Sequence, residues 1–93
     1  MIRKRIVFTG NVQGVGFRWR ARQAASLYNC TGWCRNDWEG TVTMEIQGKE
    51  EAIAKVIQSI EAGRYIWIRN MDVSCVPSGA FSTTTHPWPS KTR

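Results

Sequence analysis

"IRKRIVFTGNVQGVGFRWRARQAASLY" (residues 2–28) contains two different hydrophobic periods, and a glycine-rich loop separates them. Residues 2–9 alternate with period two, with Ile6 and Phe8 on the more apolar side. Such alternation is typical of a β-strand with one buried face. Gly10 is predicted to end this strand.

The period changes after the glycines. Apolar residues then recur at positions i, i+4, i+7, i+8 and i+11, and these are Phe17, Ala21, Ala24, Ala25 and Tyr28. This spacing is that of one face of an α-helix. The glycine-rich loop therefore joins a strand to a helix.

This loop is a candidate anion site. Backbone N–H groups in a concave turn before a helix N-terminus converge on one point and favour negative charge there. Gly14 and Gly16 permit a positive φ, and Arg18 adds a two-pronged donor suited to phosphate oxygens. Glycines alone between a strand and a helix are more often turn geometry than a ligand site. Nucleotide motifs do not fit, because Trp19 occupies the third glycine position of GxGxxG and no GK[ST] follows.

The next segment is predicted to form an antiparallel β-hairpin over residues 31–47. Every second residue of "TVTMEIQ" is apolar, and the turn residues Glu39 and Gly40 precede this segment. A second helix is predicted in residues 49–63, with Glu50 and Glu51 in its first turn and Gly63 as its C-terminal cap. Its apolar stripe consists of Ile53, Val56, Ile57 and Ile60.

A last strand is predicted in "YIWIRNMDVSCV" (residues 65–76). Its apolar positions change parity near Arg69 and Asn70, which indicates a bulge there. The resulting order is β-α-β-β-α-β, the split β-α-β arrangement. It predicts an α+β, ferredoxin-like sandwich in which two helices cover one face of an antiparallel sheet.

Length and composition predict one domain over residues 1–93, with a loosely held Ser-, Thr- and Pro-rich tail from about 78 to 93. Thirteen Lys and Arg against seven Asp and Glu give a formal net charge of +6, which favours anionic partners. No apolar run approaches the roughly 20 residues of a membrane span, and no signal-peptide core is present. We therefore expect a cytoplasmic protein without a membrane partner.

Cysteines and aromatic residues suggest no further chemistry. Cys30, Cys34 and Cys75 are odd in number and lack a CxxC pair, so free, mostly buried thiols are expected. Five tryptophans suggest stacking on single-stranded nucleic acid. However, Trp33 and Trp67 lie in predicted strands, where packing is favoured, and the RNA-recognition signature is absent. We expect no nucleic-acid partner, and we assign no role to the single histidine of the tail.

Three motifs together resemble the acylphosphatase family. They are "VQGVGFR" (12–18), "GWCRN" (32–36) and "EGTV" (39–42), and the resemblance extends over about residues 3–76. Seven consecutive loop residues followed by GWxxN are far more specific than glycines alone. The resemblance implies hydrolysis of an acyl phosphate to a carboxylate and inorganic phosphate.

By the family pattern, Arg18 binds the phosphoryl group and Asn36 holds and orients the attacking water. The loop residues expected around the phosphate are Asn11, Val12, Gln13, Gly14, Val15, Gly16 and Phe17. Phosphoryl transfer through a loose transition state mainly needs positioning and charge stabilisation, so no metal ion or other cofactor is expected. The expected partners of a monomeric enzyme are a small-molecule acyl phosphate and inorganic phosphate.

Other interpretations stay open at this point. Without its motif Arg18 is one more solvated arginine, and Asn36 begins the hairpin turn through a side-chain hydrogen bond. A noncatalytic anion- or RNA-binding module on the same fold is the alternative function. Related loop sequences also occur at the start of larger carbamoyl-transfer maturation proteins.

The sequence departs from the family pattern at three places. Asn11 replaces a common basic residue, which removes a charge near the loop and predicts weaker phosphate binding. Glu39 replaces the aspartate of a common DG turn. Family members usually close with a strand containing F-x-[IV], whereas Phe81 is followed here by "ST", so that strand is not predicted.

Overall fold

The computed structural model describes residues 2–76, and these form an α+β sandwich. The predicted order β-α-β-β-α-β is confirmed by β1 (Ile2–Asn11), α1 (Phe17–Leu27), β2 (Thr31–Asn36), β3 (Val42–Gly48), α2 (Glu50–Glu61) and β4 (Trp67–Val76). The predicted tail, a closing strand near Phe81 and the single histidine, His86, lie outside the described residues.

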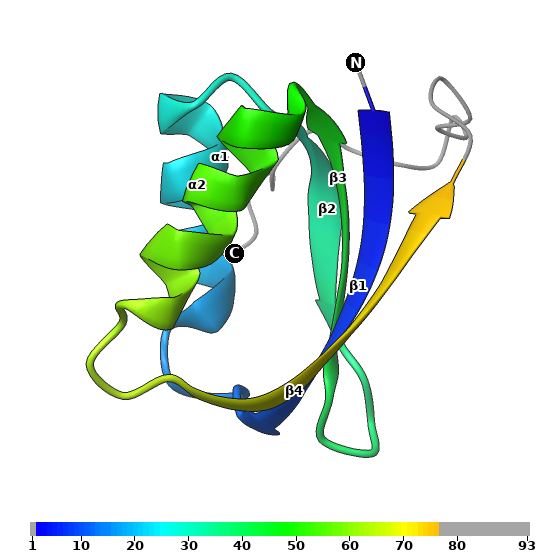
Figure 1. Ribbon diagram of the computed structural model, residues 1–93. Helices are drawn as coiled ribbons and strands as arrows, with labels where there is room; N and C mark the ends of the chain where they lie inside the picture. The colour runs from blue at the N-terminus through cyan, green and yellow to red at the C-terminus, as the bar shows by residue number, and fades with distance from the viewer. Residues whose placement is uncertain (1, 77–93) are drawn as a thin grey trace.

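The four strands form one antiparallel sheet in the order β2-β3-β1-β4. The two helices lie side by side on one face of this sheet, as Figure 1 shows. Each β-α-β unit skips one strand, which is the split arrangement of the ferredoxin-like fold. The β1–α1 loop, the β2–β3 turn and the α2–β4 connection all lie at the same end of the sheet (Figure 1). Segments distant in sequence therefore meet there.

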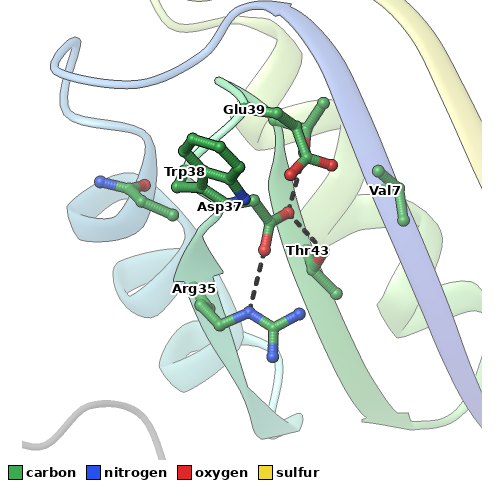
Figure 2. A pocket seen from close by; sticks show the side chains of 8 residues that line it. Val7, Arg35, Asp37, Trp38, Glu39 and Thr43 are labelled. Carbon is green, nitrogen blue, oxygen red and sulfur yellow. Dashed lines mark hydrogen bonds and ion pairs between the residues drawn. The ribbon is translucent and has the colours of Figure 1, made fainter.

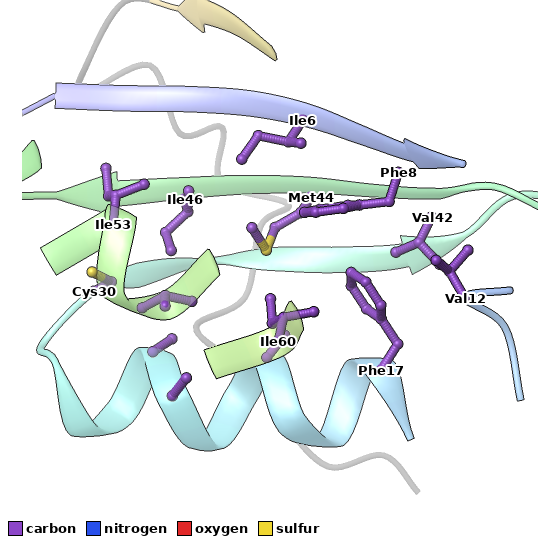
Figure 3. Packing of buried hydrophobic residues seen from close by; sticks show 14 of the residues in the cluster. Ile6, Phe8, Val12, Phe17, Cys30, Val42, Met44, Ile46, Ile53 and Ile60 are labelled. Carbon is purple, nitrogen blue, oxygen red and sulfur yellow. The ribbon is translucent and has the colours of Figure 1, made fainter. Parts of the chain in front are cut away.

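The core lies between the helices and the sheet (Figure 3). Its largest fully buried side chains are Phe8, Phe17, Ile6, Met44, Ile46, Ile53, Ile60, Val12, Val42 and Val56. The rings of Phe8 and Phe17 meet edge to face with centroids 4.8 Å apart, a favourable aromatic geometry. This contact fixes the start of α1 against β1, immediately after the glycine-rich loop.

The prediction that Gly10 ends the first strand is wrong, because β1 continues through Gly10 to Asn11. Thr9 pairs with Asn70 and Gly10 pairs with Ile68, so the predicted bulge in β4 is confirmed at Arg69. Gly10 has φ 138°, and a Cβ there would lie 2.2 Å from the carbonyl oxygen of residue 67. A glycine is required here by this close backbone approach, not by a strand end.

The predicted capping role of Gly63 is also wrong. The C-cap of α2 is Ala62, which has right-handed helical angles, and Gly63 is not among the positive-φ glycines of the described residues. A Cβ on Gly63 would approach Ile66 Cδ1 to 2.7 Å and Arg20 Nε to 2.9 Å. Both atoms belong to side chains, one in the same α2–β4 connection and one in α1.

Two expectations about burial need correction. The three thiols are free, as predicted, but they are not mostly buried, because Cys34 is only half-buried and Cys75 is exposed. Trp33 is half-buried, with the Arg35 guanidinium 5.4 Å from its ring centroid. Trp67 is 58% exposed, so packing does not explain it.

Candidate functional site

The loop between β1 and α1 contains two glycines in the left-handed backbone conformation. Gly14 has φ 72° and Gly16, the N-cap of α1, has φ 83°. A Cβ at either position would meet nothing within 4 Å, so the left-handed conformation, not a lack of space, favours glycine. No side chain caps the helix N-terminus at Gly16, which leaves N–H groups of the first turn for another acceptor.

Buried side chains hold both ends of this loop. Val12 is 1% exposed and Phe17 is 2% exposed, and both belong to the core (Figure 3). Val15 packs partly against the same core. The apolar side chains of the loop therefore pack toward the core, while Gly14 and Gly16 are exposed to solvent.

Arg18 lies in the first turn of α1 with its side chain exposed. Burial raises the pKa of the Cys34 thiol to about 12, although the nearby Arg18 charge acts to lower it. Arg18 is thus close enough to β2 for its charge to act on Cys34. Asn36 lies two residues after Cys34 in β2, and alternate residues of a strand share a face. The helix start and the end of β2 bring Arg18 and Asn36 to the same side of the sheet.

Arg20, in the same helix, makes a structural contact between the two helices. Its Nη1 donates to the Ser59 carbonyl oxygen over 3.1 Å, which ties α1 to α2. Asn11, at the end of β1, is exposed, and its Nδ2 lies 3.5 Å from the Tyr65 carbonyl oxygen. Arg18, by contrast, has an exposed side chain in the first turn of α1.

The β2–β3 turn is organised by the carboxylate of Asp37 (Figure 2). Its Oδ2 accepts hydrogen bonds from Thr41 Oγ1 over 2.8 Å and from Thr43 Oγ1 over 2.7 Å. Arg35 Nε donates to Oδ1 over 2.9 Å. Burial alone would raise the pKa of Asp37, but these hydrogen bonds and the Arg35 charge outweigh it and hold the pKa below its ordinary value. Asp37 is therefore a fixed anion within the turn.

Gln13 connects this turn to the glycine-rich loop. Its Nε2 donates to the carbonyl oxygens of Asp37, over 2.5 Å, and Thr41, over 2.9 Å. The two carbonyls are 24 and 28 residues away from Gln13 in sequence. One amide side chain thus fixes the distance between the loop and the segment that follows Asn36.

Asn36 ends β2, pairs with Val42 and is exposed. Together with Asp37 and Trp38 it lines an open pocket at the turn. The turn-forming role considered for Asn36 belongs to Asp37, whose carbonyl oxygen accepts from the Gly40 N–H over 3.0 Å. Sequence reasoning missed this role. Asp at the first and Gly at the fourth position of "DWEG" is the signal of a type I turn that indicates it.

Two further features of the described residues bear on possible ligands and partners. In residues 2–76, no group of three His, Cys, Asp or Glu side chains is arranged to hold a metal ion. Neither helix of this part of the chain is long and apolar enough to cross a membrane.

The chain combines a ferredoxin-like fold with an uncapped helix N-terminus behind a left-handed glycine loop and an arginine in the first turn of that helix. A family model described as acylphosphatase matches residues 4–79. The chain belongs to the acylphosphatase family, and it is an acylphosphatase enzyme.

Individual relatives agree with this assignment. The chain is 44% identical over 63 residues to an acylphosphatase of Geobacillus kaustophilus, which covers 68% of this chain and 67% of the relative. The crystal structure of acylphosphatase from Bacillus subtilis superposes with a TM-score of 0.78 at 26% identity, covering 94% of each chain. Full-length HypF, in a phosphate- and nucleotide-bound form, gives a TM-score of 0.74 at 28% identity over 87% of this chain and 11% of HypF. A similar domain therefore occurs within a much larger protein.

Proposed function

We propose that this enzyme hydrolyses acyl phosphates by holding the phosphoryl group between the amides of residues 11–17 and the guanidinium of Arg18, while Asn36 orients the attacking water. The observation that carries the proposal is the Gln13 side chain, which ties the loop to the carbonyl oxygen of Asp37, the residue after Asn36, and to that of Thr41 across the turn. Phosphate cradle and water holder are thereby kept at a fixed separation.

The cradle acts on the negative charge of the phosphoryl oxygens. Loop amides and the helix N-terminus supply fixed dipoles, and the Arg18 guanidinium donates two parallel hydrogen bonds to adjacent oxygens. Because these donors are in place before the reaction, little reorganisation is needed as charge develops in the transition state. The glycine conformations at positions 14 and 16 support this role.

The water step needs no other catalyst. The Asn36 amide orients one water in line with the scissile bond; the water oxygen forms the new P–O bond as the P–O bond to the acyl group breaks. The electron pair leaves with the carboxylate, and a phosphate oxygen takes the water's proton. A carboxylate is a good leaving group, so positioning and charge stabilisation supply most of the catalysis.

Cys34 is not part of this reaction. Its thiol lies near Arg18, but burial raises its pKa to about 12. The thiolate, not the thiol, is the nucleophile in cysteine chemistry. At neutral pH Cys34 is therefore a neutral side chain beneath the site, which favours direct attack by water over a covalent intermediate on sulfur.

The test is release of inorganic phosphate from acetyl phosphate by wild type and Asn36→Ala. A residue that holds the water acts mainly on the chemical step, so Asn36→Ala lowers kcat by roughly 10²-fold. Competitive inhibition by inorganic phosphate stays within about twofold, because the cradle is intact. Full activity of Asn36→Ala contradicts the assigned role. Phosphate binding by the wild type without hydrolysis would favour the noncatalytic anion-binding module instead.

A further inference from the structure

A second open pocket adjoins the glycine-rich loop on the side of the α2–β4 connection. Gly14 and Val15 line it from the loop, and Arg64, Tyr65 and Trp67 line it from the connection and the start of β4. Its volume is about 750 Å³, within the range of small-molecule sites, about 300–1,000 Å³. No acidic side chain lines it, so an anion at the loop meets no like charge there.

Two large aromatic side chains stand exposed at this pocket. Tyr65 is 68% exposed and Trp67 is 58% exposed. Their backbones are held in place: Trp67 pairs with Asn11 at the end of β1, and Ile66 beside them is buried. Aromatic rings that are anchored by the backbone yet exposed beside a polar site offer a flat apolar surface to a ligand.

We propose that this pocket receives the acyl group of the substrate and selects acyl phosphates whose acyl group is an aromatic ring. This inference rests on the proposed function. Gly14 and Val15 belong to the loop that is proposed to hold the phosphoryl group, and they also line the pocket. In the proposed arrangement the phosphoryl group occupies the loop, and the acyl group extends past Gly14 and Val15 toward Tyr65 and Trp67.

The chemistry of the lining favours an aromatic acyl group over a short alkyl one. Paired aromatic rings gain about 0.5–1.5 kcal/mol beyond the area that they bury, which corresponds to roughly twofold to tenfold. A methyl group has no such gain, because it carries no π-system. Arg64 places a positive charge at the rim, which suits the carboxylate that forms when the P–O bond breaks.

The test compares benzoyl phosphate with acetyl phosphate. Trp67→Ala and, separately, Tyr65→Ala should each lower kcat/KM for benzoyl phosphate by about fivefold and leave the value for acetyl phosphate within twofold. Leu27→Ala is the matched control, because Leu27 is 71% exposed at the opposite end of α1 from the loop. An equal loss on both substrates, or no loss on either in both variants, would overturn the proposal.

A binding measurement separates this inference from catalysis. Calorimetric titration with phenylphosphonate and methylphosphonate, which the enzyme cannot hydrolyse as acyl phosphates, should give tighter binding of the phenyl compound to wild type and to Leu27→Ala. Trp67→Ala should remove most of that difference. Equal affinity for the two compounds in wild type contradicts the aromatic pocket even if hydrolysis is observed. Preference for the phenyl compound without hydrolysis of any acyl phosphate supports the pocket while the proposed function fails.

Discussion

Arg18 is the side chain on which the proposed phosphate site depends most. It stands exposed at the start of α1, one residue after the buried Phe17 and two after the left-handed Gly16. The buried ring and the glycine fix the backbone, so the guanidinium starts from a defined position. A planar guanidinium donates two parallel hydrogen bonds to phosphate oxygens, whereas an ammonium acts as a point charge.

Arg18→Lys should therefore lose most of its activity although it keeps the charge. We expect kcat/KM for acetyl phosphate to fall by roughly 10²-fold, the scale of removing one pre-organised donor from developing charge. Arg22→Lys, the same change one turn further along α1, is the matched control and should stay within about threefold. Steady-state kinetics of both variants measure this difference. Near-wild-type turnover of Arg18→Lys would exclude bidentate recognition of the phosphoryl group.

The β2–β3 turn and the glycine-rich loop act as one unit because the Gln13 side chain joins them. Gln13→Ala removes its hydrogen bonds to the carbonyl oxygens of Asp37 and Thr41. The two bonds together contribute about 1–3 kcal/mol to the free energy of unfolding. We expect a loss of that size in urea denaturation and a KM for acetyl phosphate raised several-fold. Gln23→Ala, at an exposed position of α1, should change neither quantity, and an unchanged KM in Gln13→Ala would show that the loop holds its shape alone.

Asp37 makes the stability of this turn dependent on pH. Its pKa in the folded protein lies below its ordinary value of 3.8, so the folded state favours the carboxylate. Its contribution is therefore complete above that ordinary pKa and is lost as the pH falls through the lower folded pKa. The buried carboxyl of Glu45, paired with Arg3 and Arg5, has a lowered pKa as well and acts in the same direction.

We expect the melting temperature of wild type to fall steeply below about pH 4. Asp37→Asn should have a lower melting temperature at pH 7. Its melting temperature should fall less steeply in acid, because asparagine has no carboxylate that can be protonated. Glu39→Gln, an exposed carboxyl in the same turn, should leave the curve parallel to that of wild type. Thermal unfolding followed by circular dichroism from about pH 7 to pH 2.5 measures this. Parallel curves for wild type and Asp37→Asn would contradict the linkage.

The elements were predictable from the sequence where burial sets the pattern. The stripe of Phe17 and the alanines of α1, and the alternation of β3, follow directly from facing one core. Glycines were less predictable, because their roles depend on distant backbone. Gly10 allows a close approach to β4, and Gly63 allows contact with Ile66 and Arg20. Neither neighbour is visible in the local sequence.

The candidate site was predictable only in part for the same reason. The loop, Arg18 and Asn36 are predicted from contiguous motifs, whereas the bonds from Gln13 to the β2–β3 turn join residues that are far apart in the chain. The exposed aromatics at positions 65 and 67 were likewise hidden, because a tryptophan in a strand is usually buried. Their proposed role depends on the fold, which brings the α2–β4 connection beside the loop (Figure 1).

The architecture explains why so small a protein can hold such a site. The crossovers of the split β-α-β arrangement return the chain three times to the same end of the sheet (Figure 1). The β1–α1 loop, the β2–β3 turn and the α2–β4 connection meet there, each anchored by core residues such as Phe17, Val42 and Ile66. A formal net charge of +6 favours anionic ligands over the whole surface. A specific site must therefore be distinguished from this general attraction.

The measurement that tests the phosphate site most directly is thermal unfolding in inorganic phosphate, with chloride at matched ionic strength as the control. An anion that binds only the folded chain stabilises it by RT ln(1 + [L]/Kd), about 1.4 kcal/mol at ten times Kd, which raises the melting temperature of a domain of this size by about 5 °C. We predict such a phosphate-specific rise for wild type and its loss in Arg18→Ala. Equal shifts in phosphate and chloride, or a phosphate-specific shift that survives Arg18→Ala, would contradict a phosphate site built from the glycine-rich loop and Arg18.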